Sequence, residues 1–71
     1  MTTNALNRMA AARAAEIADG RFDKRVQKHV AAGMSPGVAH DAALTGIDLD
    51  VLNGQGDYAL PPDQQFKAFT E

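Results

Sequence analysis

Histidine, serine and carboxylate side chains are the groups of this chain that could support acid–base or nucleophilic chemistry. The chain has two histidines, His29 and His40, and His40 is followed directly by Asp41. Neighbouring residues on a helix project about 100° apart, so His40 and Asp41 cannot form an oriented dyad. Ser35 precedes His40 by five residues, which is off the helical repeat, and a nucleophile also needs a third, orienting group. We therefore predict surface histidines, no catalytic residues and no enzyme activity.

The acidic segment at residues 48–54 invites comparison with a calcium loop. An EF-hand loop needs oxygen ligands at positions one, three and five, glycine at six and glutamate at twelve. Counted from Asp48, position five is Leu52, glycine falls at position seven and position twelve is Ala59. The chain also has no cysteine, which excludes thiolate sites. We expect no metal and no cofactor, with Asp48 capping a helical turn.

Two short predicted helices flanking Gly33 raise the possibility of a helix-turn-helix. The second of them, residues 36–45, carries Asp41 and no arginine, lysine, asparagine or glutamine, the side chains on which base readout mostly depends. The basic residues lie on the preceding segment and could contact phosphates without sequence preference; they are Arg21, Lys24, Arg25 and Lys28. The pattern disfavours nucleic-acid binding, and these four residues are instead candidates for orienting a protein partner.

The same stretch carries a family resemblance. The residues involved are Ala32-Gly33-Met34-Ser35, Ala39, Ala43-Leu44, Gly46, Asp48-Leu49 and Leu52. Over residues 26–53 they resemble the loop and following helices of a ubiquitin-associated-type three-helix module. The resemblance implies docking of peptides or proteins rather than catalysis, and we use it as an analogy of local packing.

The C-terminal segment holds large apolar residues outside the predicted helical unit. Tyr58, Leu60, Phe66 and Phe69 lie around the Pro61-Pro62 pair, in a segment with little capacity to fold alone. Aromatic anchors on an extended or short helical segment are typical of docking into a partner's groove. Alternatively, these side chains pack back over the helices and complete a thin core. The sequence leaves both roles open.

Helix-start and helix-stop residues predict the elements that position these groups. We expect helices over residues 4–19, 21–32 and 36–45, a short turn over 49–52 and a last short helix within 63–69. Gly20 and Gly33 end the first two, and Ser35-Pro36 begins the third. Thr45-Gly46 is expected to end the third helix. The class is all-α: three to four short helices with an extended, Pro-containing tail that ends in a short helix.

Helical periodicity predicts which faces are buried. On the first helix the apolar stripe consists of Leu6, Ala10, Ala14, Ile17 and Ala18. On the second helix Phe22, Val26 and Val30 recur every four residues and form one line. The many alanines make these faces thin, and they permit close approach of another helix.

Composition limits the core, and charge is unevenly distributed. Of 71 residues, 45% are apolar, but 14 are alanine and 18 are large. The net charge is −2, with residues 1–28 at +3 and residues 29–71 at −5. This asymmetry indicates either charge-complementary docking, within the chain or to neighbours, or a chance distribution in a small chain. A deep enclosed active site is excluded in so small a chain.

No segment approaches the roughly 20 consecutive apolar residues of a membrane-spanning helix. Residues 9–15 are alanine-rich and are interrupted by Arg13, so they do not match a secretory signal. We expect a chain of the cytoplasm or of a virion, without a membrane partner.

We therefore expect a small helical unit at residues 1–54 and a tail with aromatic anchors at 55–71. The predicted function is that of a non-enzymatic accessory protein that binds other proteins, as a minor component of an assembly such as a phage particle. The partner is another protein, in a homo-oligomer or a multi-subunit assembly. The alternative is a regulator or inhibitor docking on one protein target, of antitoxin or anti-defence type. A small nucleic-acid-binding protein ranks third.

Overall fold

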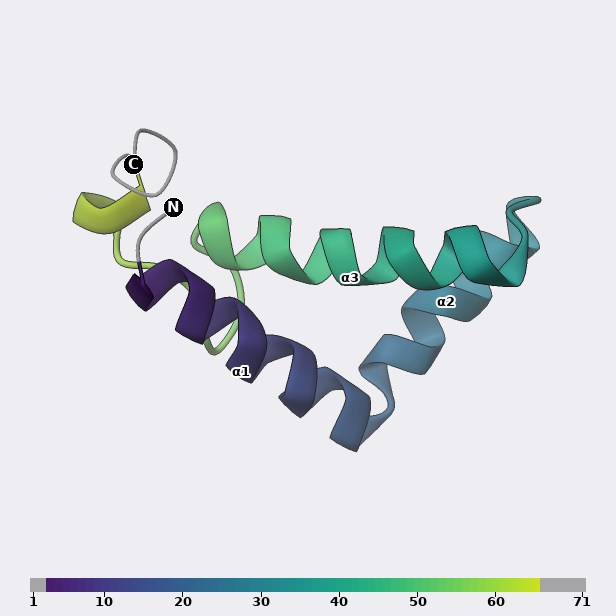
Figure 1. Cartoon of the computed structure of the whole chain (residues 1–71), viewed down its shortest axis with the longest axis horizontal. Helices are drawn as coiled ribbons and strands as arrows, with labels where there is room; N and C mark the ends of the chain where they lie inside the picture. The colour runs from purple at the N-terminus through teal and green to yellow at the C-terminus, as the bar shows by residue number, and fades with distance from the viewer. Residues whose placement is uncertain (1–2, 66–71) are drawn as a thin grey trace.

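The computed structural model describes residues 3–65, which form three helices joined by short turns (Figure 1). Helix α1 is Thr3–Asp19, α2 is Arg21–Ala31 and α3 is Pro36–Leu52. A loop follows α3, and residues 62–65 form a further helical turn. The described residues contain no strand, so the predicted all-α class is confirmed.

Helices α1 and α2 form a V, and α3 runs back across its open side (Figure 1). Gly20 alone separates α1 from α2, and its φ of 87° lies in the left-handed region that glycine tolerates best. The Asp19 carboxylate accepts a hydrogen bond from the backbone N–H of Arg21 at 3.0 Å, which satisfies a free donor at the start of α2. The backbone extends over 36 × 23 × 16 Å, so the helices form one flat layer.

The core is a small cluster where α1, α3 and the loop after α3 meet. Its buried members are Ala5, Met9, Ala12, Ile47, Val51, Leu52 and Leu60, with half-buried Phe22 packed against them. Ala39 and Ala43 of α3 are also buried. Alanines at these positions let the helices approach closely, but each adds little apolar area. Because hydrophobic stabilisation scales with the apolar area removed from water, this core is modest.

The predicted apolar stripe of α1 is wrong. Leu6 and Ile17 are 52% and 57% exposed, and the alanines of that stripe are exposed as well. The buried face of α1 consists instead of Ala5, Met9, Ala12 and Glu16. The physical reason is that α3 packs against the small residues, while the carboxylate of Glu16 meets a cation of α2. The predicted line on α2 is wrong at Val30, which is exposed, whereas Phe22 and Val26 are half-buried.

Helix α3 begins as predicted but does not end where we expected. Ser35 caps its N-terminus by accepting a hydrogen bond from the N–H of Val38 at 3.5 Å, and Pro36 is the first helical residue. The helix then continues through Gly46 to Leu52, so the predicted break at Thr45-Gly46 and the separate turn at residues 49–52 are wrong. Asp48 therefore lies within the helix, where it pairs with Arg13 instead of capping a new turn.

The chain after α3 folds back onto the helices. The N–H of Leu60 donates to the carbonyl of Val51 at 3.0 Å, and the side chain of Gln65 donates to the carbonyl of Leu60 at 3.0 Å. The Asn4 side chain of α1 donates to the side chain of Gln64. These contacts hold Leu60 in the core, beside the N-terminal half of α1.

The two isoleucines provide a direct test of this core. Ile47 is 1% exposed, so truncation to alanine leaves a cavity, and we expect Ile47→Ala to lower the free energy of unfolding by about 2–5 kcal/mol. Ile17→Ala is the matched control, because the same atoms are removed from an exposed position, and we expect a change within about 0.5 kcal/mol. Urea unfolding followed by circular dichroism measures both. Equal losses would contradict the observed burial.

Candidate functional site

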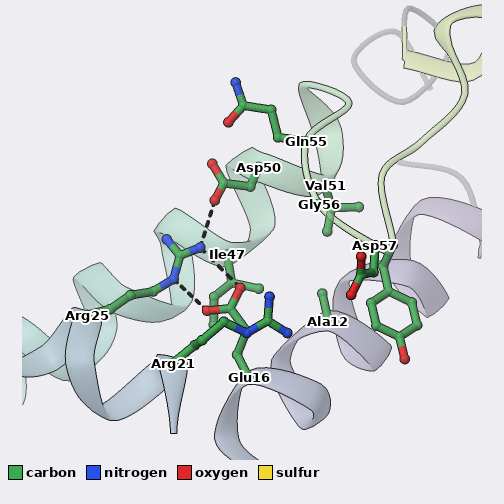
Figure 2. Close-up of a pocket in the computed structure, with 11 residues that line it drawn as sticks. Ala12, Glu16, Arg21, Arg25, Ile47, Asp50, Val51, Gln55, Gly56 and Asp57 are labelled. Atoms are coloured by element: carbon green, nitrogen blue, oxygen red, sulfur yellow. Dashed lines mark hydrogen bonds and ion pairs between the residues drawn. The ribbon is translucent and has the colours of Figure 1, made fainter. Parts of the chain in front are cut away.

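Arg25 connects the three helices through its guanidinium group (Figure 2). From α2, its Nε donates to Glu16 Oε1 of α1 at 2.6 Å, and its Nη2 donates to Glu16 Oε2 at 3.1 Å. The same Nη2 donates to Asp50 Oδ2 of α3 at 2.7 Å. The planar donor fork of arginine suits this two-pronged contact with a carboxylate. We call Glu16, Arg25 and Asp50 the Arg25 cluster.

Burial makes the Arg25 cluster energetically important. Glu16 is 7% exposed, and a buried carboxylate without a cationic partner would be costly. Hydrogen bonds to Glu16 and then to Asp50 raise the pKa of the Arg25 guanidinium above its ordinary value, so the cation is held in place. Gly46 of α3 lies directly beside it, since a Cβ at this position would be 3.1 Å from Nη1 of Arg25. The glycine that we predicted to end a helix instead leaves room for this guanidinium.

Two further ion pairs join basic and acidic residues within the chain. Arg13 of α1 donates through Nε to Asp48 Oδ1 of α3 at 2.9 Å and pairs with the second carboxylate oxygen as well. The hydrogen bond to Asp48 raises the pKa of the Arg13 guanidinium. Arg21 pairs with Asp19 at an exposed position. Opposite charges of the two halves of the chain thus meet in the Arg13–Asp48 and Arg25–Asp50 pairs, which is the intramolecular form of the predicted docking.

A cavity of about 230 Å³ adjoins the Arg25 cluster (Figure 2). It is lined by Ala12, Glu16, Arg21, Arg25, Ile47, Asp50, Val51, Gln55, Gly56, Asp57 and Tyr58. The cavity is smaller than the roughly 300 Å³ at which small-molecule pockets typically begin. Its buried carboxylate and guanidinium already bind each other. In the described part of the chain, no group of three or more His, Asp or Glu side chains is placed to hold a metal ion.

The predicted docking residues of the tail have different environments. Tyr58 is 37% exposed beside the cavity, whereas Leu60 is 2% exposed within the core. Leu60 thus takes the second of the two roles that the sequence left open, namely packing back onto the helices. Phe66 and Phe69 lie outside the described residues.

The four predicted basic docking residues do not form one surface. Arg25 is turned into the cluster, and Arg21 is paired with Asp19. Lys24 and Lys28 are exposed on α2.

Among the residues considered for acid–base chemistry, His40 packs its ring edge-on against Phe22, with ring centroids 4.9 Å apart. Its Nδ1 lies 4.0 Å from Asp41, too far for a hydrogen bond.

Apart from Tyr58, sequence reasoning missed a set of exposed apolar side chains. In the described part of the chain, the large apolar residues with more than a third of their surface exposed are Leu6, Ile17, Val30, Met34, Val38, Leu49 and Tyr58. A signal was present in α3, where Val38, Ala42, Thr45 and Leu49 follow helical spacing opposite the buried positions. Helix α3 is apolar on two sides, which is typical of a helix covered on both.

Comparisons with known proteins return no relative. No family model, no curated protein and no solved structure matches the chain. The resemblance to a ubiquitin-associated-type module is not supported by the structure either, because α3 runs unbroken where that resemblance places two helices. Among the described helices, none is long and apolar enough to cross a membrane.

Removing the arginine of the Arg25 cluster tests its contribution. We expect Arg25→Met to lower the free energy of unfolding by about 2–3 kcal/mol, somewhat below fully buried pairs because Arg25 is 30% exposed. Adding Glu16→Met should restore most of that loss, since the stranded carboxylate is then gone. Arg21→Met, which breaks an exposed pair, should cost less than about 1 kcal/mol. A double-mutant cycle, measured by urea unfolding, gives the coupling energy between positions 16 and 25. Additive effects of the two substitutions would contradict an interaction between Glu16 and Arg25.

Gly46 provides a test of packing against the same guanidinium. Alanine is normally favoured over glycine inside a helix by about 0.5–1 kcal/mol. We expect Gly46→Ala to give no gain in the free energy of unfolding, because Arg25 is held by hydrogen bonds and cannot withdraw from the new methyl group. In an Arg25→Ala background, Gly46→Ala should recover the normal gain.

Gly37→Ala is the control for this test, since a Cβ at Gly37 of α3 meets no atom within 4 Å. It should stabilise both backgrounds equally, as measured by thermal unfolding. A gain from Gly46→Ala in the presence of Arg25 would contradict the close approach.

Proposed function

We propose that this chain is a small, non-enzymatic helical protein that works by binding other proteins. The observation that carries the proposal is the distribution of its large apolar side chains. Among the described residues, seven are more than a third exposed, whereas five are buried: Met9, Ile47, Val51, Leu52 and Leu60. A described part that exposes more large apolar residues than it buries gains stability when a partner covers them.

The flat shape supports the same proposal. A single layer of helices, 16 Å across its shortest dimension, leaves both broad faces and the outer edges open to contact. Small domains bury a low fraction of their surface, and many need association or a covalent staple for stability. The chain has no cysteine for a disulfide. Association with another protein is therefore the available means of completing its apolar packing.

Two forms of this function are consistent with these observations. One is a component of a larger assembly, such as a phage particle, and the other is a regulator that docks on a single protein. Nucleic-acid binding receives less support, because Arg25 is turned inward and Arg21 is paired, leaving Lys24 and Lys28 as the exposed cations of the predicted basic set.

Crosslinking in the producing cells, followed by capture of the tagged full chain, tests the proposal. We expect a discrete protein to co-purify, and its recovery to fall at least tenfold with one of three exposed apolar substitutions: Ile17→Glu, Val38→Glu or Tyr58→Ser. Point substitutions are required here, because removing the tail would also remove Leu60 from the core.

The matched control carries Lys24→Ser and Lys28→Ser, which change exposed residues without altering apolar surface. It should retain the partner. Recovery at the wild-type level in all three apolar variants would refute the proposed mode of binding. So would a loss of recovery that is confined to the lysine variant. If a partner is captured, sedimentation and thermal unfolding of the purified chain separate the two forms, since a regulator is a folded monomer with a cooperative melt and an obligate assembly component is not.

A further inference from the structure

The outer face of α3 carries an uncharged stripe whose residues are exposed or half-buried. It consists of Val38, Ala42, Thr45 and Leu49, spaced four, three and four residues apart, so these side chains share one stripe. Val38 is 56% exposed and Leu49 is 46% exposed. Helices α1 and α2 both lie on the opposite side of α3, against Ala39, Ala43 and Ile47 (Figure 1).

We propose that this face binds the same face of a second copy of the chain, with the two α3 helices antiparallel. The proposal rests on the proposed protein-binding function and names the partner for one surface. Soluble helices usually carry charged residues opposite their buried face, and this stripe carries none. A partner for such a surface must be apolar, and a second copy supplies an identical stripe.

The order of side-chain sizes on the stripe suits an antiparallel pair. Large residues occupy its two ends, Val38 and Leu49, and small residues occupy its centre, Ala42 and Thr45. In an isologous two-fold contact, Val38 of each copy meets Leu49 of the other. The small central residues then allow the helix axes to approach at the crossing point. A parallel pair would place Val38 against Val38 and Leu49 against Leu49, and would lose the contact between the smaller and the larger side chain.

The charges of α3 permit the approach of two copies. The helix carries three aspartates, which would repel one another if all were free. Asp48 is paired with Arg13 and Asp50 with Arg25 of the same chain, so two of the three are neutralised internally. In the antiparallel register, Asp41 lies at the level of Gly46 of the other copy, about 3 Å along the helix axis from Asp48 of that copy, whose carboxylate is already paired with Arg13. The antiparallel arrangement also opposes the two helix dipoles favourably.

The size of the surface sets the expected strength of the contact. With 17 residues, α3 is about 25 Å long, so a single helix pair buries less than the roughly 800 Å² per partner of a standard interface. We therefore expect a reversible dimer with a dissociation constant on the order of tens of micromolar or weaker. Sedimentation must extend to millimolar protein to detect it.

Sedimentation equilibrium of the full chain and two substitutions provides the first arm of the test. Wild type should show a monomer–dimer equilibrium, and Val38→Glu should weaken it at least tenfold. Position 38 is the third residue of α3 after the Ser35 cap, where glutamate favours helix formation, so this variant retains its fold. Ile17→Glu, at an equally exposed isoleucine of α1, is the matched control and should leave the dimer unchanged.

Single cysteines provide the second arm, because the natural chain contains none. Oxidising a mixture of Val38→Cys and Leu49→Cys chains should yield a crosslinked pair. Val38→Cys alone should crosslink at least tenfold less, since two-fold antiparallel packing separates its two copies by about 16 Å along the helix axis. Efficient crosslinking of Val38→Cys with itself would establish a parallel pair and overturn the proposal.

The remaining outcomes also decide the question. A monomer at every concentration overturns the proposal, as does a dimer that is lost with Ile17→Glu but retained with Val38→Glu. A monomer that still captures another protein in cells would leave the general protein-binding function intact and refute self-association alone. Circular dichroism of each variant confirms that losses of association do not reflect unfolding.

Discussion

One guanidinium group holds the three helices in register. Arg25 reaches from α2 to a carboxylate on α1 and another on α3, and the buried Glu16 makes that contact obligatory. Apolar packing alone would specify the arrangement weakly, because much of the core is alanine and alanine faces slide past one another at little cost. An ion pair with fixed donor directions specifies one geometry where such a core does not. Hydrophobic residues of similar volume in place of a buried ion pair often stabilise a fold equally well. The contribution expected of the Arg25 cluster is therefore to select one arrangement of the helices.

Local signals in the sequence predicted the class and most helix ends. Ser35-Pro36 marks the start of α3, and Gly20 and Gly33 follow the first two helices; each of these acts through backbone conformation within a few residues. Gly46 was misread for a physical reason. Its lack of a side chain serves the guanidinium of Arg25, 21 positions away, and a residue whose role depends on a distant contact resembles a local stop signal when read alone.

The prediction of the buried face of α1 was wrong for the same reason. Periodicity assigned the core to the largest residues, Leu6 and Ile17, but α3 packs against the face bearing Ala5, Met9 and Ala12, where it can approach closely. Glu16 could not be assigned to that face from its own type, because a buried carboxylate is acceptable only with its partner in place. The exposed apolar side chains of α1 were missed as a consequence, since Leu6 and Ile17, which the periodicity assigned to the core, remain exposed.

The association proposed for α3 would be coupled to the folding of this chain. The Arg25 cluster and the Arg13–Asp48 pair consume the charges on the flanks of α3, which both orients the helix and removes the repulsion that would keep another apolar helix away from its outer face. A ligand that binds only the folded state stabilises that state by an amount that grows with the logarithm of its concentration above the dissociation constant. A partner on α3 would thus supply stabilisation that the alanine-rich core does not. Conversely, weakening the Arg25 cluster would reduce association without altering any residue of the contact surface.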